Sequence, residues 1–308
     1  MINVLFAGHP SRWPIYQKPL QDAFAKAGLD AGLRTEFDPA LVDYIVYAPN
    51  SPLQDFTPYT RCKAVLNLWA GVEAIVGNQT LTQPLARMVD FGLKQGMTEW
   101  VVGHVLRYHL DIDYFLARQS GEWEPKVPPL SRDRKVTVLG LGELGAATAV
   151  ALAALGFDVI GWSRSAKDVP GVRCLHGDDL DTALTGAEIV VLLLPKTPAT
   201  EDILNADRLA LLAPGAAVLN PGRGALIDDD ALLSALNSGR VGHATLDVFR
   251  VEPLPDDHPY WAHPNVTVTP HIASETRPET ASEVIAENIR RSEAGEGLLY
   301  LVDRNLGY

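Results

Sequence analysis

Three side chains of complementary chemistry lie just beyond strand-like apolar runs in the second half of the chain: Arg223, Glu252 and His271. If those runs are strands of one parallel sheet, their carboxyl ends bring the three residues to the edge where such sheets bind ligands. Taken singly, each has an ordinary structural interpretation: a surface arginine in a turn, a solvated loop glutamate, or a histidine that bonds its surroundings. Together they suggest a shared chemistry.

The trio matches what the reduction of a 2-keto acid requires. A cation such as Arg223 can hold the substrate carboxylate and polarise the keto oxygen, and His271 can protonate that oxygen as a hydride arrives. A carboxylate such as Glu252 can orient the imidazole and favour its protonated form. The hydride itself must come from a cofactor.

A glycine-rich motif in the middle of the chain predicts how that cofactor is bound. The apolar run 136–139 leads into GLGELG (140–145), and an alanine-rich helical stretch follows. In a strand–turn–helix of this kind, the glycines allow a tight turn, close approach of a diphosphate and close helix packing. Free backbone N–H groups and the helix dipole then favour the diphosphate. The alternative is a glycine-rich turn that binds nothing.

The end of the next predicted strand indicates which dinucleotide is bound. NAD sites usually carry an acid there for the ribose 2′-hydroxyl. The strand 158–162 instead ends in Ser163, Arg164 and Ser165, with Lys167 close behind, and its own acid lies at the opposite end. An arginine can pair with a 2′-phosphate and a serine can donate to it. We therefore predict NADP(H); the alternative is that Arg164 is a solvated surface charge.

Apolar periodicity predicts an α/β chain with parallel sheets that place these residues. Strands and a helix alternate in the first third, a long helix with Thr98 as its N-cap follows, and Gly121–Pro129 forms an irregular arm. The block 135–270 repeats the alternation as a doubly wound sheet. The expected strands are 2–7, 43–47, 64–68, 136–139, 158–162, 189–194, 216–219, 244–248 and 266–269, and the expected helices include 20–27, 98–118 and 276–294.

Composition narrows the class of protein. The 308 residues are 47% hydrophobic and 21% charged, which is enough apolar material for sizeable cores and too much for a disordered chain. The net charge of −12 argues against binding nucleic acid or an anionic membrane surface. Cys62 and Cys174 are isolated, we find no residues with the spacing of a metal site, and we see no signal peptide or membrane span. We expect a cytoplasmic protein without a metal.

Beyond the glycine motif, four segments resemble the D-2-hydroxyacid dehydrogenase family: LLLPKTPAT (192–200), NPGRGALID (220–228), LDVFRVEPLP (246–255) and TPHIAS (269–274). Three more are similar to its glyoxylate/hydroxypyruvate reductase A branch: WSRSAKDVPGV (162–172), HPNVTVTPHIASETRP (263–278) and VDRNLGY (302–308). The resemblance covers nearly the whole chain. It implies NADPH-dependent reduction of glyoxylate to glycolate and of hydroxypyruvate to D-glycerate.

The resemblance also implies roles for individual residues. Arg223, Glu252 and His271 match the family's catalytic residues, and Arg223 also binds the substrate. Asp247 matches a residue near the nicotinamide carboxamide. The cofactor-binding residues expected in full are Gly140, Gly142, Glu143, Leu144, Gly145, Ser163, Arg164, Ser165, Lys167, Leu194, Pro195 and Asp247.

The family's architecture is two Rossmann-like domains with doubly wound parallel sheets and the active site in the cleft between them. Here it implies a substrate-binding, flavodoxin-like domain of residues 1–97 plus 275–308, and an NADP-binding domain of residues 98–274. It also implies a homodimer, because relatives reach across the interface with the arm that here contains Trp123. In the first domain, the substrate carboxylate is expected to meet the backbone amides of Trp69, Ala70, Gly71 and Val72.

Alternative functions remain open. An NADP(H)-sensing, corepressor-like binding protein has the same fold but no turnover. A dehydrogenase for a larger 2-keto acid such as phenylpyruvate is a second alternative, if Trp69, Met97 and Trp100 make an apolar pocket. Formate dehydrogenases of this fold pair their histidine with glutamine, so Glu252 argues against them. Phosphoglycerate dehydrogenase is disfavoured because the chain lacks its regulatory extension and has no acid at position 163 or 164.

Overall fold

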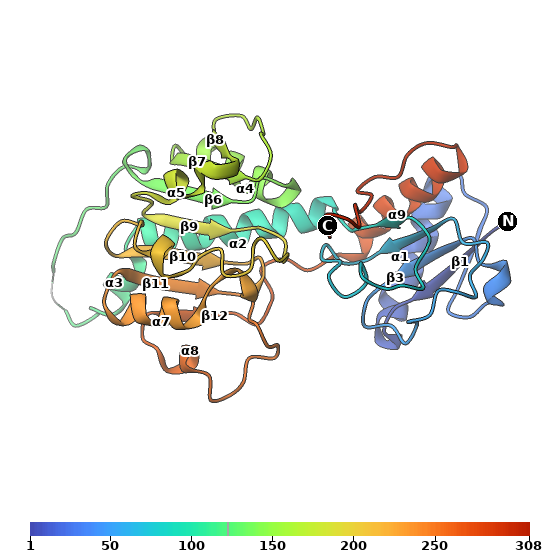
Figure 1. The fold of residues 1–308 in the computed structure, drawn as a ribbon, viewed down its shortest axis with the longest axis horizontal. Coiled ribbons are helices and arrows are strands. Elements are labelled where there is room, and N and C mark those ends of the chain that lie inside the picture. The colour runs from blue at the N-terminus through green and yellow to red at the C-terminus, as the bar shows by residue number, and fades with distance from the viewer. Residues whose placement is uncertain (122) are drawn as a thin grey trace. The chain divides into compact units, whose positions relative to one another are not determined.

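The computed structural model describes residues 1–121 and 123–308, which form two compact units. Unit 1 consists of Met1–Leu93 and Glu275–Tyr308, and unit 2 of Lys94–Ser274. Each unit contains one sheet whose strand pairings are parallel, as Figure 1 shows. The predicted α/β class is thereby confirmed. None of the helices in the described part of the chain combines the length and the apolar character of a membrane span.

Unit 1 is built on a five-stranded sheet in the order β2-β1-β3-β4-β5, the flavodoxin-like order. Alternate strand residues pack on two helices that cover one face, and loops with the C-terminal tail cover the other face. The strands are β1 (Ile2–Ala7), β2 (Ala31–Arg34), β3 (Tyr44–Tyr47), β4 (Ala64–Asn67) and β5 (Leu85–Ala86), and the helices are α1 (Trp13–Lys26), α9 (Pro278–Glu293) and the short 3-10 turns η1 (Pro10–Arg12) and η2 (Pro39–Leu41).

Unit 2 carries a seven-stranded sheet in the order β12-β11-β10-β9-β6-β7-β8. The chain runs from β6 outward to β8, then returns to place β9 on the other side of β6. This reversal is the switch point beside which doubly wound sheets bind ligands. The strands are β6 (Lys135–Leu139), β7 (Asp158–Ser163), β8 (Arg173–His176), β9 (Ile189–Leu192), β10 (Ala216–Asn220), β11 (Val241–Leu246) and β12 (Val266–Val268).

Helices cover both faces of the unit 2 sheet. α2 and α4 bury side chains against one face, with Val136 and Val138 of β6 among the residues they cover. α5 and α7 cover the other face, where Leu139 lies. The helices are α2 (Phe91–His109), α3 (Ile112–Leu116), α4 (Glu143–Ala154), α5 (Leu180–Leu184), α6 (Ala206–Leu209), α7 (Asp229–Asn237) and α8 (Pro259–Ala262), with η3 (Ser131–Asp133), η4 (Gly177–Asp179) and η5 (Gly224–Leu226).

The long helix α2 differs from the prediction at both ends. It begins at Phe91 and not at Thr98, because the Asp90 carboxylate accepts the Gly92 N–H at 3.0 Å, as the side chain of an N-cap residue does. Thr98 lies inside the helix and donates its hydroxyl to the Lys94 carbonyl. The helix ends at His109, and Asp111 takes a left-handed φ of 54° that turns the chain into α3.

Candidate active site

The glycine motif forms the turn between β6 and α4. Gly140 has a φ of 104°, and a Cβ there would lie 2.5 Å from the Leu193 carbonyl oxygen. A Cβ on Gly145 would lie 1.8 Å from the Gly140 carbonyl oxygen. These two glycines are therefore required by the turn and by the close packing of the helix on the strand.

Gly142 has a different explanation. It is the N-cap of α4, and no side chain caps the helix N-terminus there. A Cβ placed on Gly142 would meet no atom of the described residues within 4 Å. The turn itself thus leaves open space in front of the helix N-terminus, as a diphosphate requires. Glu143, which follows, points a carboxylate toward the Lys94 ammonium, so its negative charge is matched within unit 2. Leu144 is half-buried against the α2–α4 core.

A hydrogen bond from the Ser163 hydroxyl shapes the loop at the end of β7. Ser163 is buried, and its hydroxyl donates to the Ser165 carbonyl at 2.7 Å. In this structure that proton is used within the loop. Arg164, Ser165 and Lys167 are exposed beside it, and Asp158 stands at the other end of the strand.

The loop after β9 closes on itself beside the glycine turn. Leu193 N–H donates to Leu139 O at 2.7 Å, which continues the pairing of β9 with β6 beyond its last strand residue. Leu194 is buried in the core and Pro195 is half-buried. The Thr200 hydroxyl donates to the Pro195 carbonyl at 2.7 Å and fixes the loop.

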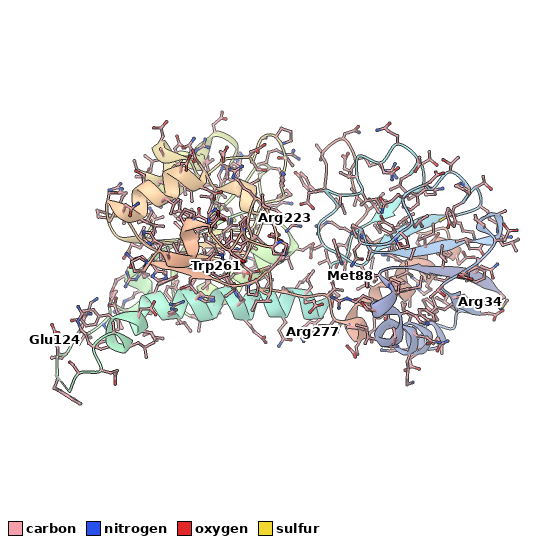
Figure 2. The ribbon with its side chains drawn as sticks, turned by 90° about the horizontal axis from the view of Figure 1, so that it is seen from below. Arg34, Met88, Glu124, Arg223, Trp261 and Arg277 are labelled. Carbon is pink, nitrogen blue, oxygen red and sulfur yellow. The ribbon has the colours of Figure 1, made fainter. Side chains whose placement is uncertain are left out.

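Arg223 stands in a tight turn after β10 and is labelled in Figure 2. The buried Asn220 holds this turn: its amide donates to the Arg223 carbonyl at 2.9 Å and its oxygen accepts the Gly222 N–H at 3.1 Å. The guanidinium donates to the Gly222 carbonyl at 2.6 Å. A Cβ on Gly224 would lie 2.0 Å from the backbone of Phe249, so the Arg223 turn packs directly on the next loop.

That next loop brings Glu252 to His271. Glu252 Oε2 and His271 Nδ1 are 2.7 Å apart, and Glu252 Oε1 accepts the Phe249 N–H at 2.9 Å. Because a carboxylate accepts, Nδ1 carries the proton of this hydrogen bond, and Nε2 is the nitrogen left to face a substrate. The His271 side chain is 51% exposed, so it is open to a ligand.

Asp247 lies under the His271 loop and is fully buried. Its carboxylate accepts from the Thr269 hydroxyl at 2.5 Å and from the N–H groups of Ile272 and Ala273 at 2.9 Å each. Its backbone carbonyl accepts the His271 N–H at 2.8 Å. These contacts give Asp247 a role in holding the loop, in addition to the cofactor contact that the family resemblance implied.

The predicted carboxylate loop belongs to unit 1. Trp69 is 43% exposed, Ala70 and Gly71 are half-buried, and Val72 is buried. Asn67 fixes the loop by donating to the carbonyls of Trp69 and Gly71 at 2.8 and 3.1 Å. Sequence reasoning missed Asn67, as it missed Asn220, because a single asparagine after a strand has no distinctive pattern.

Two residues suggested for a roomy substrate pocket have a structural explanation. Met97 is 6% exposed and lies in the core between α2 and the sheet, and Trp100 packs against the same core. This packing explains both residues without a role in the pocket, although Ala273 of the His271 loop belongs to the same core. Among the described residues, no cluster of three histidines, cysteines or acids is arranged to hold a metal ion.

Comparison with known proteins identifies the family. Residues 102–273 match the family model of the D-isomer specific 2-hydroxyacid dehydrogenase, NAD binding domain. Glyoxylate/hydroxypyruvate reductase A from Serratia proteamaculans is 44% identical over 80% of this chain and 82% of its own length.

Solved structures extend the likeness over the whole chain. A D-isomer specific 2-hydroxyacid dehydrogenase from Xanthobacter autotrophicus, in complex with NADPH and MES, has a TM-score of 0.92 and 43% identity over 100% of this chain and 99% of that chain. The NADPH-dependent glyoxylate/hydroxypyruvate reductase from Sinorhizobium meliloti, in complex with NADP and sulfate, has a TM-score of 0.86 and 32% identity over 100% of both chains. The chain therefore belongs to the D-2-hydroxyacid dehydrogenase family, in its glyoxylate/hydroxypyruvate reductase A branch.

Proposed function

We propose that this protein reduces small 2-keto acids with NADPH, converting glyoxylate to glycolate and hydroxypyruvate to D-glycerate. The observation that carries the proposal is the Glu252–His271 pair at 2.7 Å, on loops that follow neighbouring strands next to the Arg223 turn. A histidine or an arginine found alone in such a loop could equally have only a structural role, so neither residue by itself would indicate catalysis. The names of the relatives from Serratia and Sinorhizobium support the same substrates.

In the proposed mechanism, Arg223 binds the substrate carboxylate and polarises the keto oxygen. His271 gives the proton on Nε2 to that oxygen, and Glu252 holds the ring through Nδ1 and stabilises the charged imidazole before transfer. Bound NADPH would supply the hydride. Asp247 keeps the His271 backbone in place while the proton moves.

Unit 2 has the features that an NADP(H) molecule needs. The open space at Gly142 and the uncapped N-terminus of α4 suit the diphosphate. Arg164 and Lys167, at the exposed end of β7, supply positive charge for a 2′-phosphate where an NAD site has an acid. We assign cofactor binding to unit 2 and, through residues 69–72, binding of the substrate carboxylate to unit 1.

We further propose a homodimer in the cytoplasm. Both cysteines are free thiols, which suits a reducing compartment. Four large apolar side chains on the segment that follows α2 are at least half exposed, as an association surface requires. They are Leu116 (65%), Trp123 (98%), Val127 (89%) and Leu130 (58%).

The direct test is oxidation of NADPH and of NADH by the purified protein with glyoxylate, hydroxypyruvate and phenylpyruvate. We expect turnover with the two small acids, faster with NADPH. His271→Ala should lower kcat by about 1,000-fold because the proton donor is lost, and NADPH binding measured by fluorescence should be retained. NADPH binding without turnover on any keto acid would instead favour a cofactor sensor.

A further inference from the structure

We propose that Arg250 is a positioning residue for the reaction: its guanidinium ties together the loops that carry the proposed catalytic groups. The inference rests on the proposed function. Arg250 stands two residues before Glu252, in the loop after β11. As a lone charged loop residue it would be expected to be solvated, but its side chain is only 33% exposed.

The guanidinium contacts the segments that follow β10 and β9, the next two strands of the sheet on one side of β11. It donates to the Ile227 carbonyl at 2.7 Å, at the end of the segment that begins with Arg223. It also donates to the Asp202 carboxylate, in the segment that follows the β9 loop. The backbones of these two segments are already joined, because Asp202 N–H donates to Ala225 O at 2.9 Å. One side chain thus links the segments after β9, β10 and β11.

The charges around Arg250 explain why a cation is needed at this point. Glu201 and Asp229 lie 3.5 and 3.4 Å from the guanidinium, in addition to Asp202. Three carboxylates gathered at one place repel one another unless a cation lies among them. A planar guanidinium can donate in several directions at once, which the single ammonium of a lysine cannot match.

The link reaches the catalytic pair through a short stretch of backbone. Phe249, directly before Arg250, donates its N–H to Glu252 Oε1 at 2.9 Å, while Glu252 Oε2 contacts His271. The same Phe249–Arg250 backbone lies against Gly224 in the Arg223 turn. Displacement of this backbone would therefore move Glu252 away from His271 and loosen the packing beside Arg223.

The test is a double-mutant cycle of Arg250→Met and Glu252→Gln. Arg250→Met alone should lower kcat about tenfold, the scale of a misplaced catalytic group, and should leave the Kd for NADPH within about twofold. In the Glu252→Gln background, the same substitution should lower kcat only about threefold, because the carboxylate it positions is already gone and only its effect on the Arg223 turn remains. Arg250→Lys should restore part of kcat. Equal losses of kcat in both backgrounds would overturn the proposal.

Arg208→Met is the matched control. Arg208 also lies in unit 2 and also bonds one carboxylate, Asp181, and one carbonyl, that of Ile203. Ile203 is next to Asp202 in the segment after β9, but these bonds do not reach the loops after β10, β11 and β12 that carry Arg223, Glu252 and His271. We expect its kcat to equal that of the unaltered protein.

Amide hydrogen exchange tests the proposal separately from the proposed function. Exchange in the peptide 249–255 should rise in Arg250→Met and not in Arg208→Met, whether or not the protein turns over a keto acid. Unchanged exchange in both variants would show that Arg250 does not hold the loop. Raised exchange in a protein that reduces no keto acid would place the failure in the proposed function alone.

Discussion

His271 is held through both its side chain and its backbone. Glu252 fixes the ring, while the buried Asp247 accepts from the residues on either side of His271. His271 itself has a φ of 54°, in the left-handed region that costs a side chain of this kind about 1 kcal/mol. The hydrogen bonds that Asp247 accepts from the His271 loop offset that cost, and the ring is held beside Glu252.

The residue that decides the cofactor is expected to be Arg164. Arg164→Ala should raise the KM for NADPH about 30-fold, since a hydrogen bond to a charged group contributes about 2 kcal/mol, and should leave the KM for NADH nearly unchanged. Steady-state kinetics with both cofactors measure this. Arg173→Ala, at the opposite end of the neighbouring strand β8, is the control and should change neither value. Equal increases for both cofactors would contradict the NADP(H) assignment to Arg164.

At the residue scale, the catalytic residues could be predicted from the sequence, but the residues that hold them in place could not. Arg223, Glu252 and His271 stood out because each follows a strand and their chemistries combine. Asn220, Arg250 and Thr269 hold those groups in place, yet an isolated asparagine, arginine or threonine in a loop has many ordinary explanations. Their partners are distant in the chain, so only the folded structure reveals them.

At the scale of elements, the strands that were missed are β2, β5 and β8, and all three lie at sheet edges. An edge strand pairs with only one neighbouring strand, and its other edge is open. It is therefore less completely buried than a central strand and needs no continuous apolar run. β5 spans only Leu85–Ala86, and β8 reads RCLH. Central strands such as β6 and β9 are apolar on both faces, and the sequence predicted them.

Packing of α2 on the sheet predicts a pH dependence of stability. Burial, with a contribution from the Arg107 guanidinium, lowers the pKa of His243 from 6.5 to about 4, and burial also lowers the pKa of His104. In the unfolded chain His243 is protonated below about pH 6.5, whereas in the folded chain it is protonated only below about pH 4. This contribution to stability is complete above pH 6.5 and is lost as the pH falls toward 4.

Thermal unfolding between pH 7.5 and pH 5 measures the effect. His243→Gln should reduce the fall in Tm over this range by about 4 °C relative to the unaltered protein. His176→Gln, at an exposed position on β8, is the control and should leave the fall in Tm unchanged. A His243→Gln profile parallel to that of the unaltered protein would rule out His243 as a source of acid sensitivity.

At the scale of the whole molecule, the exposed apolar segment predicts association. In Figure 2 the segment around Glu124 extends beyond the end of α2, away from the unit 2 sheet. We expect light scattering to give twice the chain mass of 33.4 kDa. Replacing Leu116 and Trp123 together by aspartate should produce monomers, because the charges cannot be buried in an apolar contact. Leu41→Asp, at an exposed site of unit 1, should leave the mass unchanged.

Unit 1 is assembled from the two ends of the chain, and this has a consequence for biosynthesis. Ile285 and Ile289 of α9 complete the core in which Leu20 and Phe24 of α1 are buried. Figure 1 shows both helices on the unit that contains β1 and β3. Until α9 has left the ribosome, the N-terminal sheet has only part of its helical cover, whereas the continuous segment of unit 2 has already been synthesised. The nascent N-terminal segment therefore keeps part of its apolar surface exposed during synthesis. Chaperones bind such exposed apolar surfaces.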